Sequence, residues 1–321
     1  SNSADTSTRQ IVRIINDNAA ATGATCLEVR NDSTGPAITT IGGSGILVGS
    51  LDIGHGANGD PQSTAVGTNA LNSNASATSA VNNTAIGDNT LTALNDNLAD
   101  NNTAVGFQSG DAITSGKQNV AVGAKSLSAV ASDNNVAVGY DALNDFTGSS
   151  ATAIGSQAAD VAGSQTNLTA VGHNALGAAT SGNNNTAVGA SCLDGTIDGA
   201  ANTAMGVSAL SADCVNYNTA IGYSALYANT GSNNAALGSS ALSSFTGSNA
   251  VAVGYSAAAS ATSAGYLTAI GRSALGSTTD GTGNTAVGYG TLNQLTTGDY
   301  NTAVGHAAGQ DTYGDHNTFM G

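Results

Sequence analysis

The side chains that could do chemistry are few, and their spacing builds no catalytic set. The chain of 321 residues contains four histidines (His55, His173, His306 and His316) and a single glutamate. No histidine lies in a nucleophile motif, and no serine, histidine and aspartate can be grouped into a triad from their positions. The Gly-rich run at 42–45 lacks the helix and the downstream acid of a nucleotide-binding loop. The sequence therefore predicts no enzyme and no cofactor.

Metal binding is not predicted either. Twenty aspartates suggest calcium, but the Gly-Gly-x-Gly-x-Asp repeat of calcium-binding β-rolls is absent. Loop aspartates such as Asp194 and Asp280 change position from repeat to repeat, which favours solvated turns. Cys26, Cys192 and Cys214 have no metal-ligand spacing, and Cys192 occupies a position where other repeats place a small residue. We interpret Cys192 as a small buried filler.

Aromatic side chains recur at one position, directly after the glycine of a repeated motif. Rings at regular spacing could bind a glycan or a protein receptor on a host surface, since they combine apolar area with polar tips. The alternative is packing at a corner of the fold, and the sequence leaves both open. The residues at this position that could form a recognition edge are Phe107, Tyr140, His173, Tyr223, Tyr255 and Tyr289.

The elements that would position these rings come from a short repeat. A motif typified by Asn185, Thr186, Ala187, Val188 and Gly189 returns sixteen times, and after two longer opening intervals its glycines are 16 or 17 residues apart. Alanine fills the third position in fifteen copies, and leucine follows the glycine by four residues in eleven of fifteen. The rest of each repeat is Ser, Thr, Gly, Asn and Asp, which is typical of turns.

This period predicts an all-β, parallel β-solenoid of 16- to 17-residue coils. Two short extended stretches and two turns fit in each coil, whereas a helical hairpin repeat needs more residues and fewer glycines. Successive coils would lie ~4.8 Å apart, the spacing of paired strands. A single coil orders too much backbone for the little apolar surface it buries, so the array is the folding unit.

The alternation of side chains along a strand predicts self-association. Ala187 and Val188 must point to opposite faces, so both faces of the strand are apolar and both need a cover. We assign Val188 to the coil interior and Ala187 to a seam between chains, because a small side chain permits close approach. The motif strands would then lie innermost and the leucine strands outside.

The remaining motif positions have structural interpretations. Asn185 and its equivalents can stack into amide ladders at strand spacing. Gly189 and its equivalents mark a bend that needs a positive φ or a close backbone approach. Residues 61–321 form the array of about sixteen coils, and residues 1–60 read as an N-terminal β shaft or cap.

Charge and hydropathy exclude two classes of partner. The net charge of −15 repels phosphate backbones, so no nucleic acid is expected. No apolar run is long enough for a membrane helix, so no membrane insertion is expected.

The motif array over about 63–321 resembles the head repeats of trimeric autotransporter adhesins and repeat arrays of bacteriophage tail fibres. The phrases at 31–38 and 42–50 resemble fibre shaft sequence. The resemblance implies a left-handed β-roll assembled as a homotrimeric rod, located at a virion or bacterial surface. The period is longer than in adhesin heads, and the sequence shows neither a coiled-coil stalk nor a membrane anchor.

We therefore expect a structural and adhesive fibre segment, most consistent with a phage tail fibre that presents receptor-binding elements to a host. The head of a bacterial surface adhesin and the subunit of an end-to-end extracellular filament remain as alternatives.

Overall fold

The computed structural model describes residues 53–54, 62–72, 80–94, 99–161 and 163–321. The chain divides into two compact units between Leu51 and Asp52, and the first of them lies outside the described residues. Most of the predicted N-terminal shaft, residues 1–60, falls there, so that prediction stays a prediction. No helix among the described residues is long and apolar enough to cross a membrane.

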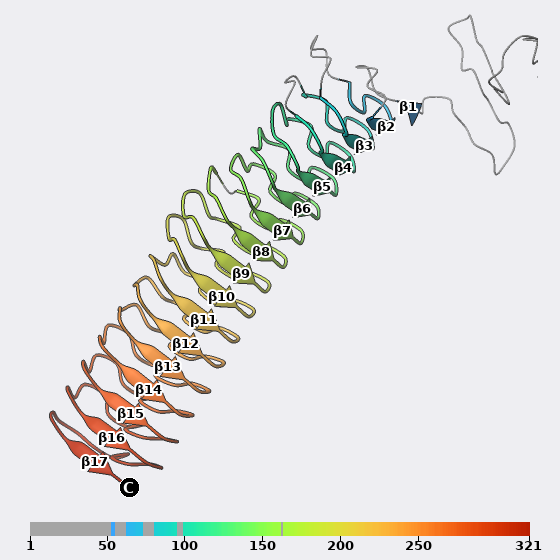
Figure 1. Ribbon diagram of the computed structural model, residues 1–321. Helices are drawn as coiled ribbons and strands as arrows, with labels where there is room; N and C mark the ends of the chain where they lie inside the picture. The colour runs from blue at the N-terminus through green and yellow to red at the C-terminus, as the bar shows by residue number, and fades with distance from the viewer. Residues whose placement is uncertain (1–52, 55–61, 73–79, 95–98, 162) are drawn as a thin grey trace, which may run out of the picture. The chain divides into compact units, whose positions relative to one another are not determined.

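The second unit is a parallel β-solenoid, as the repeat predicts (Figure 1). One strand of three residues per coil pairs in register with the strand of the next coil, so that Thr186, Ala187 and Val188 lie beside Thr203, Ala204 and Met205. A short strand, β1 (Ile53–Gly54), pairs antiparallel with β2. The parallel strands are β2 (Thr64–Val66), β3 (Thr84–Ile86), β4 (Thr103–Val105), β5 (Val120–Val122), β6 (Val136–Val138), β7 (Thr152–Ile154), β8 (Thr169–Val171), β9 (Thr186–Val188), β10 (Thr203–Met205), β11 (Thr219–Ile221), β12 (Ala235–Leu237), β13 (Val251–Val253), β14 (Thr268–Ile270), β15 (Thr285–Val287), β16 (Thr302–Val304) and β17 (Thr318–Met320).

The leucine segment of each coil is a turn and not the second strand that we expected. In the coil that follows β9, Ser191 has a φ of 49° and Leu193 a φ of 54°, and the equivalent residues of other coils repeat these values. Left-handed backbone at alternate residues cannot form a strand, but it turns the chain tightly enough to point Leu193 inward. Backbone bonds between coils continue through this turn, for example from Leu193 N–H to the Ala209 carbonyl at 3.0 Å.

The assignment of alanine and valine to the two faces of the strand was wrong. Ala187 is fully buried inside its own coil, whereas Val188 is partly exposed, and every strand from β2 to β16 shows the same order. The interior is narrow because the inward leucine of the turn faces the strand, so only a methyl group fits opposite it. Alanine is therefore required by the coil's own core and not by a seam between chains.

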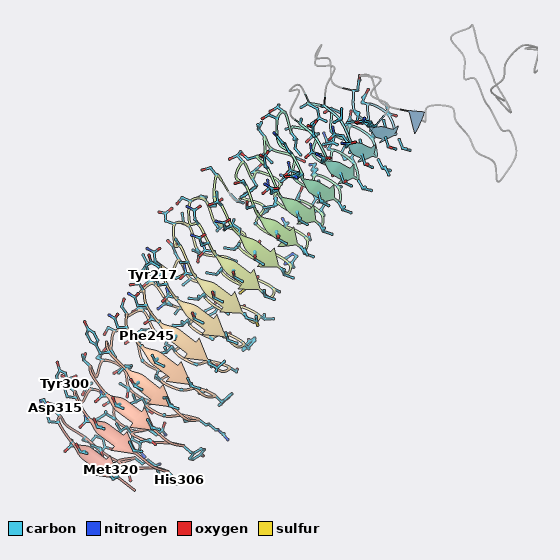
Figure 2. The ribbon with its side chains drawn as sticks, viewed as in Figure 1. Tyr217, Phe245, Tyr300, His306, Asp315 and Met320 are labelled. Carbon is cyan, nitrogen blue, oxygen red and sulfur yellow. The ribbon has the colours of Figure 1, made fainter. Side chains whose placement is uncertain are left out.

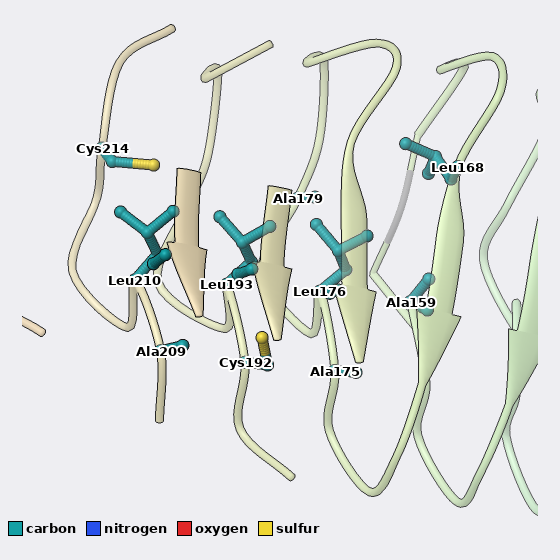
Figure 3. Packing of buried hydrophobic residues seen from close by; sticks show 14 of the residues in the cluster. Ala159, Leu168, Ala175, Leu176, Ala179, Cys192, Leu193, Ala209, Leu210 and Cys214 are labelled. Atoms are coloured by element: carbon teal, nitrogen blue, oxygen red, sulfur yellow. The ribbon is translucent and has the colours of Figure 1, made fainter. Parts of the chain in front are cut away.

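The core is a set of columns of identical residues (Figure 3). Leu176, Leu193 and Leu210 stack on one another in consecutive coils, and Cys192 takes the place that Ala175 and Ala209 hold in neighbouring coils. Cys192 is fully buried and free, so its interpretation as a small filler is confirmed.

Where a column loses its usual side chain, another residue fills the space. Gly309 replaces a core leucine, and a Cβ added there would lie 2.6 Å from a ring carbon of Phe319 and 2.9 Å from a methyl of Leu292. Phe319 is also the residue that replaces the usual alanine of the strand. The two exceptions of the last coil therefore compensate each other in volume.

Buried asparagines form a ladder, although not mainly the amide-to-amide ladder we expected. The Asn185 side chain accepts a hydrogen bond from the backbone N–H of Asn202 at 2.9 Å and donates one to the Gly199 carbonyl at 2.6 Å. Asn202 repeats the pattern with Asn218 and Val215. Each amide thus satisfies two backbone groups of the next coil that would otherwise be buried without a partner.

The motif glycines meet both requirements predicted for them. Gly189 has a φ of +143°, and a Cβ added to it would lie 2.5 Å from the Gly206 carbonyl oxygen. The carbonyl oxygen of the next coil therefore occupies the place where any other residue would carry a side chain.

A second, longer period of 99 residues is superimposed on the coils. Phe146 and Phe245 are 99 residues apart, as are Ala159 and Ala258. The five intervals between motif glycines that start at Gly139 are 16, 17, 17, 17 and 16 residues, and the five that start at Gly238 are the same. The paired residues are buried in both blocks. We call residues 139–237 the first block and residues 238–321 the second block.

Candidate interaction surface

The outer face of the sheet carries two columns of side chains that point away from the core. Alternation within each strand places Thr186 and Val188 outside, on either side of the buried Ala187. At the second of these outer positions Ile86, Met205 and Leu237 are 40%, 47% and 49% exposed, respectively. In one chain, a column of Val, Ile, Leu and Met side chains therefore runs along the outer face of the solenoid from β2 to β17, beside a column that is mostly threonine.

The rings predicted as a recognition edge lie beside this face and not in the core. Phe107, Tyr140, Tyr223, Tyr255 and Tyr289 are between 47% and 61% exposed, and His173 is exposed as well. About half of each ring surface is accessible for recognition, and the other half packs at the corner of the coil. The structure does not bring all six together, because Ala124, Ser156, Ala190 and other small residues interrupt the column. We call this column, one residue after each motif glycine, the edge column.

Within the second block the edge column is continuous from Tyr255 to His306. The guanidinium carbon of Arg272 lies 5.6 Å from the ring centroid of Tyr255 and 5.8 Å from that of Tyr289. The ring of Tyr289 stacks on His306, with 5.2 Å between centroids and an angle of 10° between planes. Four consecutive coils thus hold a stack of flat groups. Tyr255 and Tyr289 belong to the predicted recognition edge, whereas Arg272 was not predicted, although it occupies the same place in the repeat.

A further aromatic column precedes the strands and was not predicted. Tyr217, Tyr266, Tyr300 and His316 directly precede the buried asparagine position, and all four have a positive φ near 60°. Tyr300 and His316 stack at 5.2 Å between ring centroids. In Figure 2, Tyr217 and Tyr300 lie on one side of the row of strands and His306 on the other. Aligning the repeats one residue before the asparagine would have found this column.

Few ionisable groups in the described part of the chain have a displaced pKa. Burial raises the pKa of Asp160, and the charges of Asp141 and Asp145 raise it further. A hydrogen bond from the Ser263 hydroxyl at 2.7 Å lowers the pKa of Asp280. Burial raises the pKa of the Cys192 thiol to about 12, which keeps it protonated and unreactive at neutral pH.

No chemistry-bearing cluster competes with these surfaces in the described ranges. No three residues of His, Cys, Asp or Glu gather there in a way that could hold a metal ion. The chain matches no protein-family model, and no curated protein matches it in sequence.

Proposed function

We propose that this chain is a structural and adhesive fibre segment that assembles as a homotrimeric rod. The observation that carries the proposal is the column of exposed Val, Ile, Leu and Met side chains on the outer face of the sheet. A strand that is apolar on both faces is normally covered on both, and the coil interior covers only one.

The size of this face supports an interface. Sixteen strands at ~4.8 Å spacing and about 10 Å of strand width give a face of roughly 700 Å², divided between the column of Val188 and its equivalents and a column that is mostly threonine. The largest contiguous apolar patch on a soluble monomer is usually about 300–600 Å² and is often an interaction site, and an apolar column that runs along all sixteen strands suits such a site.

The repeat itself suits a second and a third copy of the same chain. All copies have the same rise per coil, so a contact made by Val188 of one coil recurs at Met205 and Ile221 of the next two. Few other partners could match a periodic surface over its whole length. Assembly of identical rods thus multiplies a weak contact by the number of coils.

The owner of the fibre is inferred from the resemblance described above. Trimeric β-roll repeats occur in phage tail fibres and in adhesin heads, and a stiff, acidic, repetitive rod suits the presentation of receptor-binding elements away from a virion. We place the segment in a phage tail fibre, as a left-handed rod outside the host cell, with a host cell-surface glycan or protein as its partner.

Paired substitutions on neighbouring residues test the assembly. Val188→Asp combined with Ile221→Asp places charges on the outer face, so we expect the mass from light scattering to fall to one chain while circular dichroism keeps its β signal. Ala187→Asp buries a carboxylate in the coil and should abolish the β signal itself. An unchanged mass in the Val188→Asp and Ile221→Asp variant would contradict the proposed interface.

A further inference from the structure

Equivalent residues of the first and second blocks are 99 positions apart, so the two blocks can be compared residue by residue. The comparison distinguishes side chains needed for packing from side chains available for recognition. Many buried pairs are identical, including Phe146 with Phe245, Ala159 with Ala258, and Leu168 with Leu267, and the buried pairs that differ include Ala179 with Thr278 and Cys192 with Thr291. The edge column differs at all five pairs that share a place in both blocks, which are Tyr140 with Ser239, Ser156 with Tyr255, His173 with Arg272, Ala190 with Tyr289, and Val207 with His306. The first block therefore builds a similar coil interior without the stacked ladder of Tyr255, Arg272, Tyr289 and His306. Stacking of the coils does not require this ladder.

The ladder holds a positive charge where the chain has few. Arg272 is the only arginine among the described residues, which otherwise contain Lys117 and Lys125 as cations and fourteen aspartates. In this part of the molecule Arg272 has two ring contacts and no ion pair. The Arg272 side chain is exposed, and the N–H groups of a guanidinium between two rings lie in its own plane, where they can donate to a ligand.

We propose that this ladder binds an anionic group, a carboxylate or a sulfate, of a polysaccharide. A planar guanidinium forms two parallel hydrogen bonds with such a group. The phenol groups of Tyr255 and Tyr289 and the imidazole of His306 stand beside it, and their polar tips suit the hydroxyl groups of the adjoining sugars. This inference rests on the proposed function, because it names the class of host receptor that the fibre segment would bind.

The probes are polygalacturonate, which carries carboxylates, dextran sulfate, which carries sulfates, and uncharged dextran. Binding of the full chain is measured by biolayer interferometry. We expect one or both anionic polymers to bind and dextran not to bind, and the polymer that binds identifies the anionic group. Arg272→Gln should weaken that binding about tenfold or more, as loss of a charge-assisted hydrogen bond does. Lys125→Gln removes an equal charge away from the ladder and should leave binding unchanged.

A graft provides the converse test. Ser156→Tyr, His173→Arg, Ala190→Tyr and Val207→His together rebuild the ladder in the first block, and should double the number of polymer sites per chain. The proposal is overturned if neither anionic polymer binds, if Arg272→Gln and Lys125→Gln have equal effects, or if the graft adds no site. Light scattering on the same variants separates these failures from a failure of assembly, since none of the substitutions lies on the outer face of a strand.

Discussion

At the scale of single residues, the backbone conformation and packing around each motif glycine exclude any other residue type. Gly189 combines a positive φ with a neighbouring carbonyl oxygen in the place of its Cβ, and the motif glycines of the other coils share this φ range. By contrast, left-handed positions such as Ser191 and Leu193 accept ordinary side chains because these point into open or matching space. Glycine is thus required by close approach rather than by the turn alone.

Gly189→Ala should lower the free energy of unfolding by at least about 2 kcal/mol, because the new methyl group must displace the backbone of the next coil. Gly290→Ala is the matched control. Gly290 has a φ of +59° and nothing within 4 Å of an added Cβ, so it should cost only about 1 kcal/mol. Denaturant unfolding measures the free energy of unfolding of both variants. Equal decreases for Gly189→Ala and Gly290→Ala would contradict the claim that the close approach of the next coil requires glycine.

Asp160 predicts a pH dependence of stability. Its folded-state pKa is raised, chiefly by burial, so ionisation is less favourable in the folded chain than in the unfolded chain. The charged carboxylate of Asp160 therefore lowers the free energy of unfolding. This loss of stability is absent below the ordinary pKa of 3.8 and becomes complete as the pH rises through the folded-state pKa. Asp160→Asn keeps a hydrogen-bond acceptor without the charge, so it should be more stable than the natural chain at neutral pH and gain nothing at acid pH. Thermal unfolding across this range would contradict the account if the natural chain gained stability over the variant as the pH rises.

At the scale of the elements, each coil is stable only through its neighbours. The bonds of Asn185, the strand pairs of β9 and the stacked Leu193 all join one coil to the next. Removing a whole coil keeps every column continuous, whereas removing part of a coil shifts all of them.

Deletion of residues 190–206 removes one interval between motif glycines and should leave a folded solenoid about 4.8 Å shorter. Deletion of 190–197 removes the inward turn residues but leaves the next strand, so the columns lose their register. We expect cooperative thermal unfolding for the first deletion and a strongly destabilised chain for the second. Similar unfolding curves for the two deletions would rule out stacking of repeats as the source of stability.

The repeat was sufficient to predict the parallel solenoid, the coil length, the glycine bend and the buried cysteine, because each depends on a regular period. It was not sufficient to orient the strand. Alternation says that Ala187 and Val188 face opposite ways, but which face is inside depends on the width of the coil, and that width is set by the inward turn at Leu193. The leucine segment was predicted as a strand, because leucine rarely adopts a left-handed backbone and no residue of the segment indicates a positive φ. The stack around Arg272 was not predicted, because arginine has no ring and its contacts with Tyr255 and Tyr289 depend on the stacking of neighbouring coils.

At the scale of the whole molecule, the interior and the surface follow different rules. Inside, Ala, Leu and Asn recur in most coils, and in the last coil Phe319 fills the space that Gly309 leaves. Outside, the strand face is regular, with one column that is mostly threonine and one of Val, Ile, Leu and Met, whereas the edge column varies from coil to coil. A uniform face suits self-association, and a varied edge suits recognition of something else.

The central claim is that the uniform face is an interface between copies of this chain. The most direct measurement is the mass of the natural chain in solution, by light scattering over a dilution series into the micromolar range. The account predicts the mass of three chains, stable on dilution because the contact is repeated along the solenoid. The mass of a single chain at micromolar concentration would contradict it and would leave the outer columns of Val188 and its equivalents without a cover.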